Sequence, residues 1–327
     1  MNGIWSVYAL LLGALMDMLL GDPRFPPHPV VLMGGLISAL EKLLRRLFPK
    51  TPAGEKAAGG LLWLITAAAA FLVPFALLRL CYRVTPWLGF GLESVMCWQC
   101  LAARSLQKES MKVKKALDGG DIEKARHAVS MIVGRDTAAL SREGVAKAAV
   151  ETVAENASDG VIAPLTFLAL GGGALGMLYK AVNTMDSMLG YVEEPYKNFG
   201  FFPAVLDDVF NFIPARLSAL IMLAAGGVLG FDAKRAFRVF RRDRRKHASP
   251  NSAQTESVMA GLLGLRLAGD ASYHGVLHKK PFIGDPLREA EPEDISRACR
   301  IMLLTSAFAL CLFGGLKLAV LFLTHAV

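Results

Sequence analysis

Long apolar runs are the first pattern along the chain. Residues 4–20, 61–80, 161–178, 213–229 and 301–323 each approach the length that crosses a bilayer as a helix. A sixth run, 85–103, is apolar except for Glu93 and closely follows the second. The pattern predicts an all-α, polytopic membrane protein with about five or six membrane segments, in which 85–103 forms a tight hairpin with the preceding span. Because a carboxylate facing lipid is costly, we expect Glu93 to face the bundle or a wet cavity.

The positive charges predict the orientation of these segments. The polar segments 21–56, 104–160 and 231–300 carry 30 of the 36 Lys and Arg residues, and six spans place all three on one side. By the positive-inside rule that side is cytoplasmic, and both termini face outward. We therefore expect a single integral membrane domain over residues 1–327, multi-pass in the cell inner membrane, with cytoplasmic excursions at about 21–56, 104–160 and 231–300.

Two features have ordinary structural explanations. The five cysteines lie in or beside apolar runs without the regular spacing of a disulfide framework, which indicates reduced packing residues. The stretch 233–247, AKRAFRVFRRDRRKH, is basic and amphipathic and directly follows an apolar run. This stretch favours contact with anionic lipid, ahead of a phosphorylated substrate and well ahead of nucleic acid, which we do not expect as a partner.

Polar residues gather at the ends of the apolar runs. The clusters are GDPRFPPHPV at 21–30, GRDT at 134–137, ETVAENASDG at 151–160, NTMDSM at 183–188, DDVFNFIPAR at 207–216 and SPNSAQTE at 249–256. Carboxylates and amides supply the oxygen ligands that Mg²⁺ prefers, and arginine recognises phosphate in a bidentate manner. Six clusters with the same chemistry favour a metal and phosphate site, although each alone is explained equally well by helix capping or loop solvation.

Helical spacing places some of these groups together. Glu151 and Glu155 lie one turn apart on one face of a helix, and Asn183 and Asp186 are three residues apart. Structural alternatives remain open, because Asp159 could cap the span that follows it, and Ser249 or Asn251 could cap the next helix. A capped helix start at 249–251 would also suit an anion.

Three motifs are set aside. GGGALG at 171–176 lies within an apolar run with no flanking strand, which favours close helix packing over dinucleotide binding. His274 and His278 have helical spacing, but Gly275 weakens a helix and no glutamate completes a zinc motif. The chain contains no P-loop motif, so nucleotide use would need another arrangement.

The motifs together resemble those of one family. DMLLGDPRFPPHPVVLMG, CLAARSL, VGRDT, VETVAENASDGVIAPL, YKAVNTMDSMLGY, DDVFNFIPARL and SPNSAQTESVMAGLLGLRLAG closely resemble the adenosylcobinamide-phosphate synthases, the CbiB/CobD family of cobalamin-biosynthesis membrane proteins. The resemblance runs from about residue 16 to 285. It implies an ATP-dependent amide ligase that joins adenosylcobyric acid to aminopropanol, its O-phosphate or an ethanolamine equivalent, with Mg²⁺ and with other membrane enzymes of cobalamin assembly as further partners.

We assign roles within that chemistry as hypotheses. The predicted catalytic residues are Asp136, Glu155, Asp159 and Asn183; the predicted substrate and phosphate ligands are Arg24, Arg135, Asn156, Arg216, Ser249 and Asn251; the predicted magnesium ligands are Asp22, Asp136, Glu155 and Asp186. Such a site would lie on the cytoplasmic face, where the polar segments meet the bilayer.

One conflict follows from the span count. With six spans the segment 179–212, which contains NTMDSM, falls on the outer side and away from cytoplasmic ATP. If this motif belongs to the site, 161–178 is re-entrant or the motif is buried in the bundle, as Pro164 and the glycines at 171–173 would permit.

Two other function classes compete with an enzyme. A transporter or a non-catalytic corrinoid-binding membrane protein is the main alternative, and a scaffold for other membrane enzymes is the second. Transporters usually carry ionisable residues at mid-span, whereas the charged clusters here lie at span ends and in loops. This placement favours the enzyme.

Overall fold

The structure, a computed structural model, describes residues 2–22, 28–191, 193–273 and 275–325. The chain divides into two compact units that alternate along the sequence. Unit 1 contains residues 1–102, 163–211 and 310–327, and unit 2 contains residues 103–162 and 212–309. The expectation of a single membrane domain stays a prediction.

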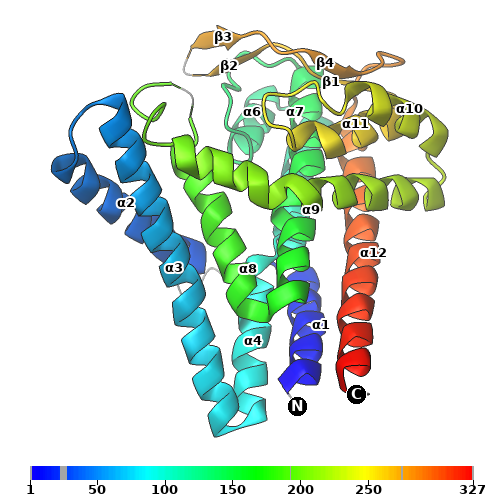
Figure 1. Cartoon of the computed structure of the whole chain (residues 1–327). Helices are drawn as coiled ribbons and strands as arrows, with labels where there is room; N and C mark the ends of the chain where they lie inside the picture. The colour runs from blue at the N-terminus through cyan, green and yellow to red at the C-terminus, as the bar shows by residue number, and fades with distance from the viewer. Residues whose placement is uncertain (1, 23–27, 192, 274, 326–327) are drawn as a thin grey trace. The chain divides into compact units, whose positions relative to one another are not determined.

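Helices make up most of the described chain, which confirms the predicted all-α fold (Figure 1). They are α1 (Asn2–Leu20), α2 (Pro29–Leu47), α3 (Pro52–Val84), α4 (Pro86–Cys100), α5 (Ala103–Asp118), α6 (Ile122–Ser130), α7 (Arg142–Ala157), the π-helical turn η1 (Ser158–Ile162), α8 (Ala163–Leu189), α9 (Phe201–Val228), α10 (Ala233–Asp243), α11 (Ser252–Leu263) and α12 (Pro292–His325).

Five helical segments are long and apolar enough to cross a membrane, as expected for a multi-pass membrane protein. They lie within α1, α3, α9, α12 and the continuous stretch from α7 to α8. Their outward surfaces expose large apolar side chains such as Leu64, Leu72 and Phe322. Lipid in place of water removes the cost of that exposure.

The predicted hairpin at 85–103 is present in unit 1, although its second arm is short. Thr85 ends α3 and caps α4 by accepting a hydrogen bond from the Trp87 N–H, 3.1 Å away. Glu93 on α4 is only 3 % exposed. Its carboxylate accepts hydrogen bonds from Ser6 Oγ and Tyr82 Oη, both at 2.6 Å. The expectation that Glu93 faces the bundle is confirmed.

Helix α8 reverses direction at two glycines. Gly172 has φ 64° and ψ −160°, a conformation that disfavours any residue with a Cβ atom. The Phe167 and Tyr179 rings stack with centroids 5.0 Å apart, whereas twelve residues of unbroken helix would separate them by about 18 Å. Gly173 N–H donates to Glu93 Oε1 at 3.2 Å and so ties the reversal to α4. The chain therefore folds back within 161–178, as the re-entrant alternative requires, and its placement in the membrane stays a prediction.

The reversal returns the chain to the end of unit 1 that holds Asp22. Burial lowers the pKa of His28, and the opposing influences of Asp22 and Lys180 show that these groups lie near it. Lys180 begins the turn that carries Asn183 and, less than two turns later, Asp186. NTMDSM and Asp22 therefore lie at the same end of unit 1.

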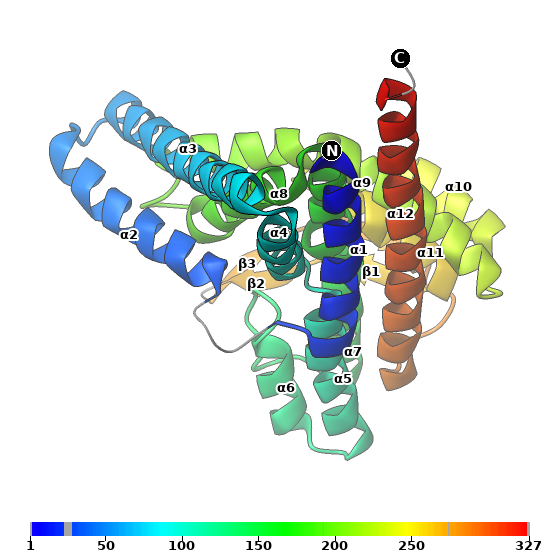
Figure 2. The ribbon, with the colours of Figure 1, turned by 90° about the horizontal axis from the view of Figure 1, so that it is seen from below.

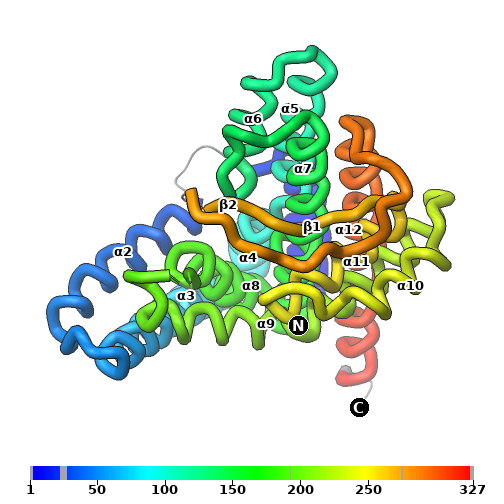
Figure 3. Tube along the Cα trace, turned by 90° about the horizontal axis from the view of Figure 1, so that it is seen from above, coloured from blue at the N-terminus to red at the C-terminus, as the bar shows by residue number. Residues whose placement is uncertain are grey.

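Unit 2 packs short helices around α7 and α11. Its core contains Val145, Ala149 and Val153 from α7 and Val258 and Met259 from α11. Four strands of three residues follow α11, namely β1 (Arg266–Ala268), β2 (Ala271–Tyr273), β3 (Val276–His278) and β4 (Phe282–Gly284). β1 pairs with β4 and β2 with β3, all antiparallel, and the strands pass over α7 and α11 (Figure 3).

The basic helix α10 uses its apolar face inside the protein. Ala236 and Phe240 belong to the core of unit 2, and Val239 is buried beside them. Asp243 is also buried, and Arg242 and Lys246 hold the pKa of its carboxyl at about 2 against the effect of burial. Most of the apolar stripe of 233–247 is therefore covered by protein, and contact of its exposed basic face with anionic lipid stays a prediction.

Candidate functional site

A small polar cavity in unit 2 brings together charged groups from four sequence segments. Its volume is about 160 Å³. It is lined by Ile132, Val133, Gly134, Arg135, Glu151, Thr152, Glu155, Asn156, His247, Glu256, Ala268, Gly269, Ala271, Tyr273 and Lys280. Pockets for drug-sized ligands exceed about 300 Å³, so this cavity suits a phosphate or a metal ion rather than a whole organic cofactor.

Helix α7 supplies two of the cavity's three carboxylates. Glu151 and Glu155, one turn apart, both line it, as their spacing predicted. Glu151 forms a close ion pair with Arg135 Nη2, and its Oε1 accepts the Ala268 N–H at 2.7 Å. Glu155 Oε1 accepts a hydrogen bond from Ser252 Oγ at 2.9 Å.

Ala268, the last residue of β1, has an unusual backbone conformation and is held by side chains of α7. Ala268 has φ 56°, which costs energy for any residue other than glycine. Glu151 accepts its N–H, and Lys147 Nζ donates to its carbonyl at 2.5 Å. Two side chains of α7 thus fix the turn that closes one wall of the cavity.

Helix α11 supplies the third carboxylate, and this one lacks a partner. Glu256 is 5 % exposed, and among the described residues its Oε2 has no hydrogen-bond donor. Burial raises the pKa of Glu256 well above its usual range, and the nearby Glu155 and Glu151 raise it further. Lys280 and Arg135 act in the opposite direction. A buried carboxylate without a donor is a ready ligand for a cation.

Donor groups face these carboxylates from the other walls. Lys280 Nζ donates to Tyr273 Oη at 2.7 Å and lies 4.6 Å from the centre of that ring. His247 Nδ1 accepts the Ser249 N–H at 3.1 Å, which leaves the proton of a neutral ring on Nε2. Arg135, Lys280 and His247 can therefore donate to phosphate oxygens while the carboxylates attract a metal.

The carboxylates fit magnesium only as a partial ligand set. Among the described residues, no three His, Cys, Asp or Glu side chains are grouped closely enough to hold a metal ion alone. Magnesium in phosphoryl-transfer sites usually takes one or two carboxylates and completes its shell with waters and substrate phosphates. Glu256 and Glu155 meet that smaller requirement, and the unpartnered Oε2 is the observation in favour.

Two further predicted residues of unit 2 lie apart from the cavity lining. Asp136 follows Arg135 but accepts the Gly275 N–H at 2.8 Å, and its own N–H donates to Ser272 O at 2.9 Å. These bonds attach it to the β2–β3 hairpin. Asp159 is half-buried within the π-helical turn η1. Such turns frequently mark functional sites, and here the turn replaces the helix start that a capping role for Asp159 would need.

The predicted anion site before α11 is a hydrogen-bonded cluster. Arg216 Nη1 donates to Asn251 Oδ1 at 2.9 Å and to Phe212 O at 2.7 Å. Ser249 Oγ accepts the Asn251 N–H at 3.2 Å. Asn251 precedes α11 without capping it through its side chain. The cluster places Ser252, the first residue of α11, against Glu155.

The remaining predicted residues belong to unit 1 or lie outside the described residues. Asp22, Asn183 and Asp186 share one end of unit 1, where Asn183 and Asp186 are half-buried on α8. Arg24 lies outside the described residues, as does His274 of the set-aside zinc motif.

Sequence reasoning missed four residues of the cavity lining as site candidates. Glu256 was part of the quoted SPNSAQTE cluster but was not selected. The signal in its favour was that it is the one ionisable residue in α11. His247, Tyr273 and Lys280 carried no such signal, because their approach to α7 depends on the short strands after α11.

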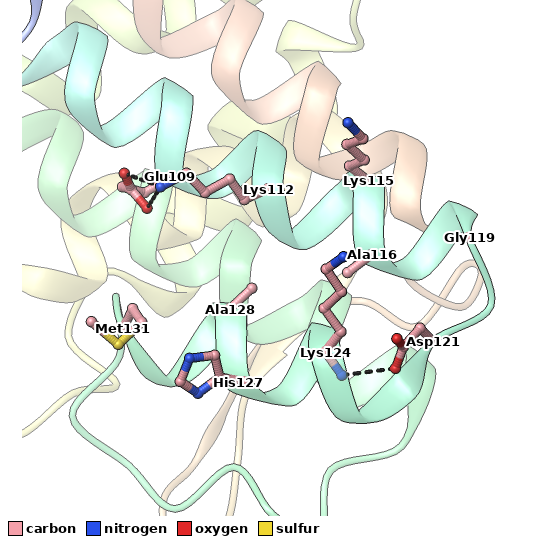
Figure 4. A pocket seen from close by; sticks show the side chains of 10 residues that line it. All are labelled: Glu109, Lys112, Lys115, Ala116, Gly119, Asp121, Lys124, His127, Ala128 and Met131. Atoms are coloured by element: carbon pink, nitrogen blue, oxygen red, sulfur yellow. Dashed lines mark hydrogen bonds and ion pairs between the residues drawn. The ribbon is translucent and has the colours of Figure 1, made fainter.

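The larger hollow in unit 2 is a weaker candidate. This groove of about 710 Å³ lies between α5 and α6 and is lined by Lys112, Lys115, Lys124 and His127 (Figure 4). Lys112 pairs with Glu109, and Asp121 caps α6. Solvated lysines on two surface helices require no ligand to explain them.

Comparison with known proteins decides the family. The model of the CobD/CbiB protein family matches residues 10–302. The chain belongs to this family. No solved structure matches the chain.

Relatives within the CobD/CbiB family cover nearly the whole chain. The cobalamin biosynthesis protein CobD of Clostridium perfringens is 45% identical over 293 residues, which are 90% of this chain and 92% of the relative. The protein of the same name from Klebsiella pneumoniae is 45% identical over 303 residues, 93% and 95% of the two chains. The cobalamin biosynthesis protein CbiB of Salmonella typhimurium is 43% identical over 310 residues, 94% and 96%.

Proposed function

We propose that this chain acts in cobalamin biosynthesis as an ATP-dependent amide ligase. It would join a propionate carboxylate of adenosylcobyric acid to the amine of aminopropanol, its O-phosphate or an ethanolamine equivalent. The names of the relatives support the pathway. The single observation that carries the chemistry is the buried, donor-free oxygen of Glu256 in a cavity shared with two carboxylates and two cations.

Amide formation from a carboxylate needs activation, because the carboxylate is a poor electrophile. In the proposed reaction a carboxylate oxygen attacks the γ-phosphorus of ATP, and ADP leaves with the bonding electron pair. The amine then attacks the acyl carbon, loses a proton and displaces inorganic phosphate. Both steps place negative charge on phosphoryl oxygens, so fixed positive groups stabilise their transition states.

The cavity residues divide between metal and phosphate. Glu155 and Glu256 would hold Mg²⁺, which when bound neutralises charge on the phosphate oxygens. Arg135 and Lys280 would donate to phosphoryl oxygens, and Glu151 keeps the Arg135 guanidinium oriented. His247 would donate from Nε2. Asn156 and Asp159 remain the predicted groups for positioning the amine.

The proposal also includes the compartment and the other predicted residues. ATP requires the cavity to face the cytoplasm at the inner membrane, in agreement with the basic residues of 104–160 and 231–300. Reporter fusions near residues 120, 195 and 275 test this placement, and an external report at 120 would contradict it. Asp22, Asp136, Asn183 and Asp186 keep their predicted roles, with Arg24 and Arg216 as further phosphate ligands.

The reaction itself can be tested with purified protein. Adenosylcobyric acid, aminopropanol or its O-phosphate, ATP and Mg²⁺ are incubated with the protein, and corrinoid amide and ADP are measured by chromatography and mass spectrometry. We expect equal amounts of amide and ADP, and none without ATP or Mg²⁺. Corrinoid that binds without amide formation under these conditions would instead support a binding or transport protein.

A further inference from the structure

A basic cavity in unit 1 lies where α2 ends and α3 begins. Its volume is about 850 Å³, and four cations line it: Lys42, Arg45, Arg46 and Lys50. Glu55 is the one acidic residue in the lining. Helices α2 and α3 lie side by side in Figure 2, so the cavity is formed between neighbouring elements of one unit.

One of the four cations is already held in place by the protein. Arg45 Nε donates to Glu41 Oε1 at 2.9 Å, and Arg45 Nη2 donates to Pro195 O at 3.1 Å. Its guanidinium also lies 4.2 Å from the centre of the Phe199 ring. Arg45 therefore forms a fixed wall of the cavity.

The other three cations have no such partners. Within the described residues, the side chains of Lys42, Arg46 and Lys50 form neither hydrogen bonds nor ion pairs, and all three residues are exposed. Three exposed cations around one hollow raise the local positive potential, which attracts an anion.

The surface beside this cavity is apolar. Along α2, Val31, Leu32, Leu43 and Leu47 are at least half exposed, while Ile37 and Leu44 on the opposite face are buried. The exposed apolar face of α3 begins at Leu61, about 14 Å along the helix from its first residue, Pro52. Charged groups at the edge of exposed leucines match the boundary between lipid headgroups and acyl chains.

We propose that this cavity binds the headgroup of an anionic phospholipid. Lys42, Arg46 and Lys50 hold the phosphate, and an acyl chain lies along Leu43 and Leu47. This site is independent of the amide ligase activity. Helix α10 is equally basic, but it does not combine exposed cations with an exposed row of leucines, because its apolar stripe is buried in the core of unit 2.

Native mass spectrometry of the purified full-length chain tests the site. The protein is titrated with phosphatidylglycerol, phosphatidylcholine or inorganic phosphate, and bound adducts are counted. The test variant is Lys42→Gln, Arg46→Gln, Lys50→Gln. The matched control is Arg238→Gln, Arg241→Gln on the exposed face of α10 together with Arg245→Gln just after it. Gel filtration and circular dichroism verify that both variants are folded.

The expected result is selective binding of phosphatidylglycerol that weakens about 100-fold in the α2 variant and is unchanged in the α10 control. Restoring charge with Lys42→Arg, Arg46→Lys, Lys50→Arg should restore binding. Equal binding by wild type and the α2 variant would overturn the proposal, and so would equal affinity for phosphatidylcholine. Displacement of the lipid by millimolar inorganic phosphate would show an anion site without lipid specificity and would also overturn it.

Discussion

Glu93 in unit 1 and Glu256 in unit 2 are both buried carboxylates, but their surroundings differ. Glu93 accepts hydrogen bonds from Ser6, Tyr82 and the Gly173 backbone, and Lys317 donates to Ser6 in the same group at 2.8 Å. Glu256 has a donor-free oxygen and two other glutamates nearby. The first arrangement stabilises a fold, whereas the second costs stability and provides a ligand position.

The sharpest test of this contrast is Glu256→Gln. The amide keeps the size of the side chain and removes its charge, so turnover should fall on the order of a hundredfold to a thousandfold, the loss found when one preorganised charged group is removed. The melting temperature in detergent should be unchanged or higher, because a desolvated charge is gone. Steady-state assays and thermal melts measure both. Glu123→Gln, at an exposed position of α6, is the matched control and should leave both values unchanged.

The opposite outcome is expected for Glu93→Ala. Removing this carboxylate leaves Tyr82 and Ser6 without their shared acceptor and Lys317 without its nearby opposite charge, and should lower stability by about 3 kcal/mol. A denaturation series in mild detergent measures this loss. The buried Cys100→Ala variant controls for truncation in the same unit and should melt close to wild type. If Glu93→Ala were as stable as wild type while Glu256→Gln unfolded, the comparison would be reversed.

A smaller effect is expected at the ion pair beside Glu256. Arg135→Gln removes a phosphate donor and leaves Glu151 without its ion-pair partner, so the KM for ATP should rise about tenfold. Kinetics at varied ATP measure this change. Arg126→Gln, which breaks an ion pair on exposed α6, should leave the KM unchanged. An unchanged KM in both variants would remove Arg135 from the phosphate site.

The smallest effect concerns pH. The pKa of Glu256 is raised in the folded state, so between its unfolded value and its higher folded value the folded chain binds more protons. Without Mg²⁺, wild type should therefore lose stability relative to Glu256→Gln as pH rises above about 4.5. Melts from pH 5 to 8 measure the difference, and added Mg²⁺ should reduce it. A constant difference would mean that Glu256 does not titrate in this range.

Sequence patterns predicted those features that depend on local spacing. The α3–α4 hairpin follows from Thr85 and Pro86, and the shared face of Glu151 and Glu155 follows from their four-residue separation. Hydropathy also predicted that the Glu93 side chain faces away from lipid. Each of these depends on residues within a few helical turns of one another.

Features that depend on long-range packing were not predictable in the same way. Lys280 and Tyr273 reach the cavity only because short strands follow α11, and no period-two pattern marked them. The apolar stripe of α10 has the same appearance in sequence whether protein or lipid covers it, and the core of unit 2 covers it here. Asp136 combines both cases. Its acidic side chain marked it as a candidate site residue, but its hydrogen bond to the β2–β3 hairpin could not be predicted from the sequence.

The hydrogen-bonded group around Glu93 has a consequence for biogenesis. Ser6, Tyr82 and Glu93 leave the ribosome first, the turn at Gly172 follows, and Lys317 is made 224 residues after Glu93. Until the final helix inserts, the nascent chain holds an acidic group in the hydrocarbon without its counter-charge. Assembly of this group must therefore wait for α12, and chains that stop before residue 317 should be substrates for membrane quality control.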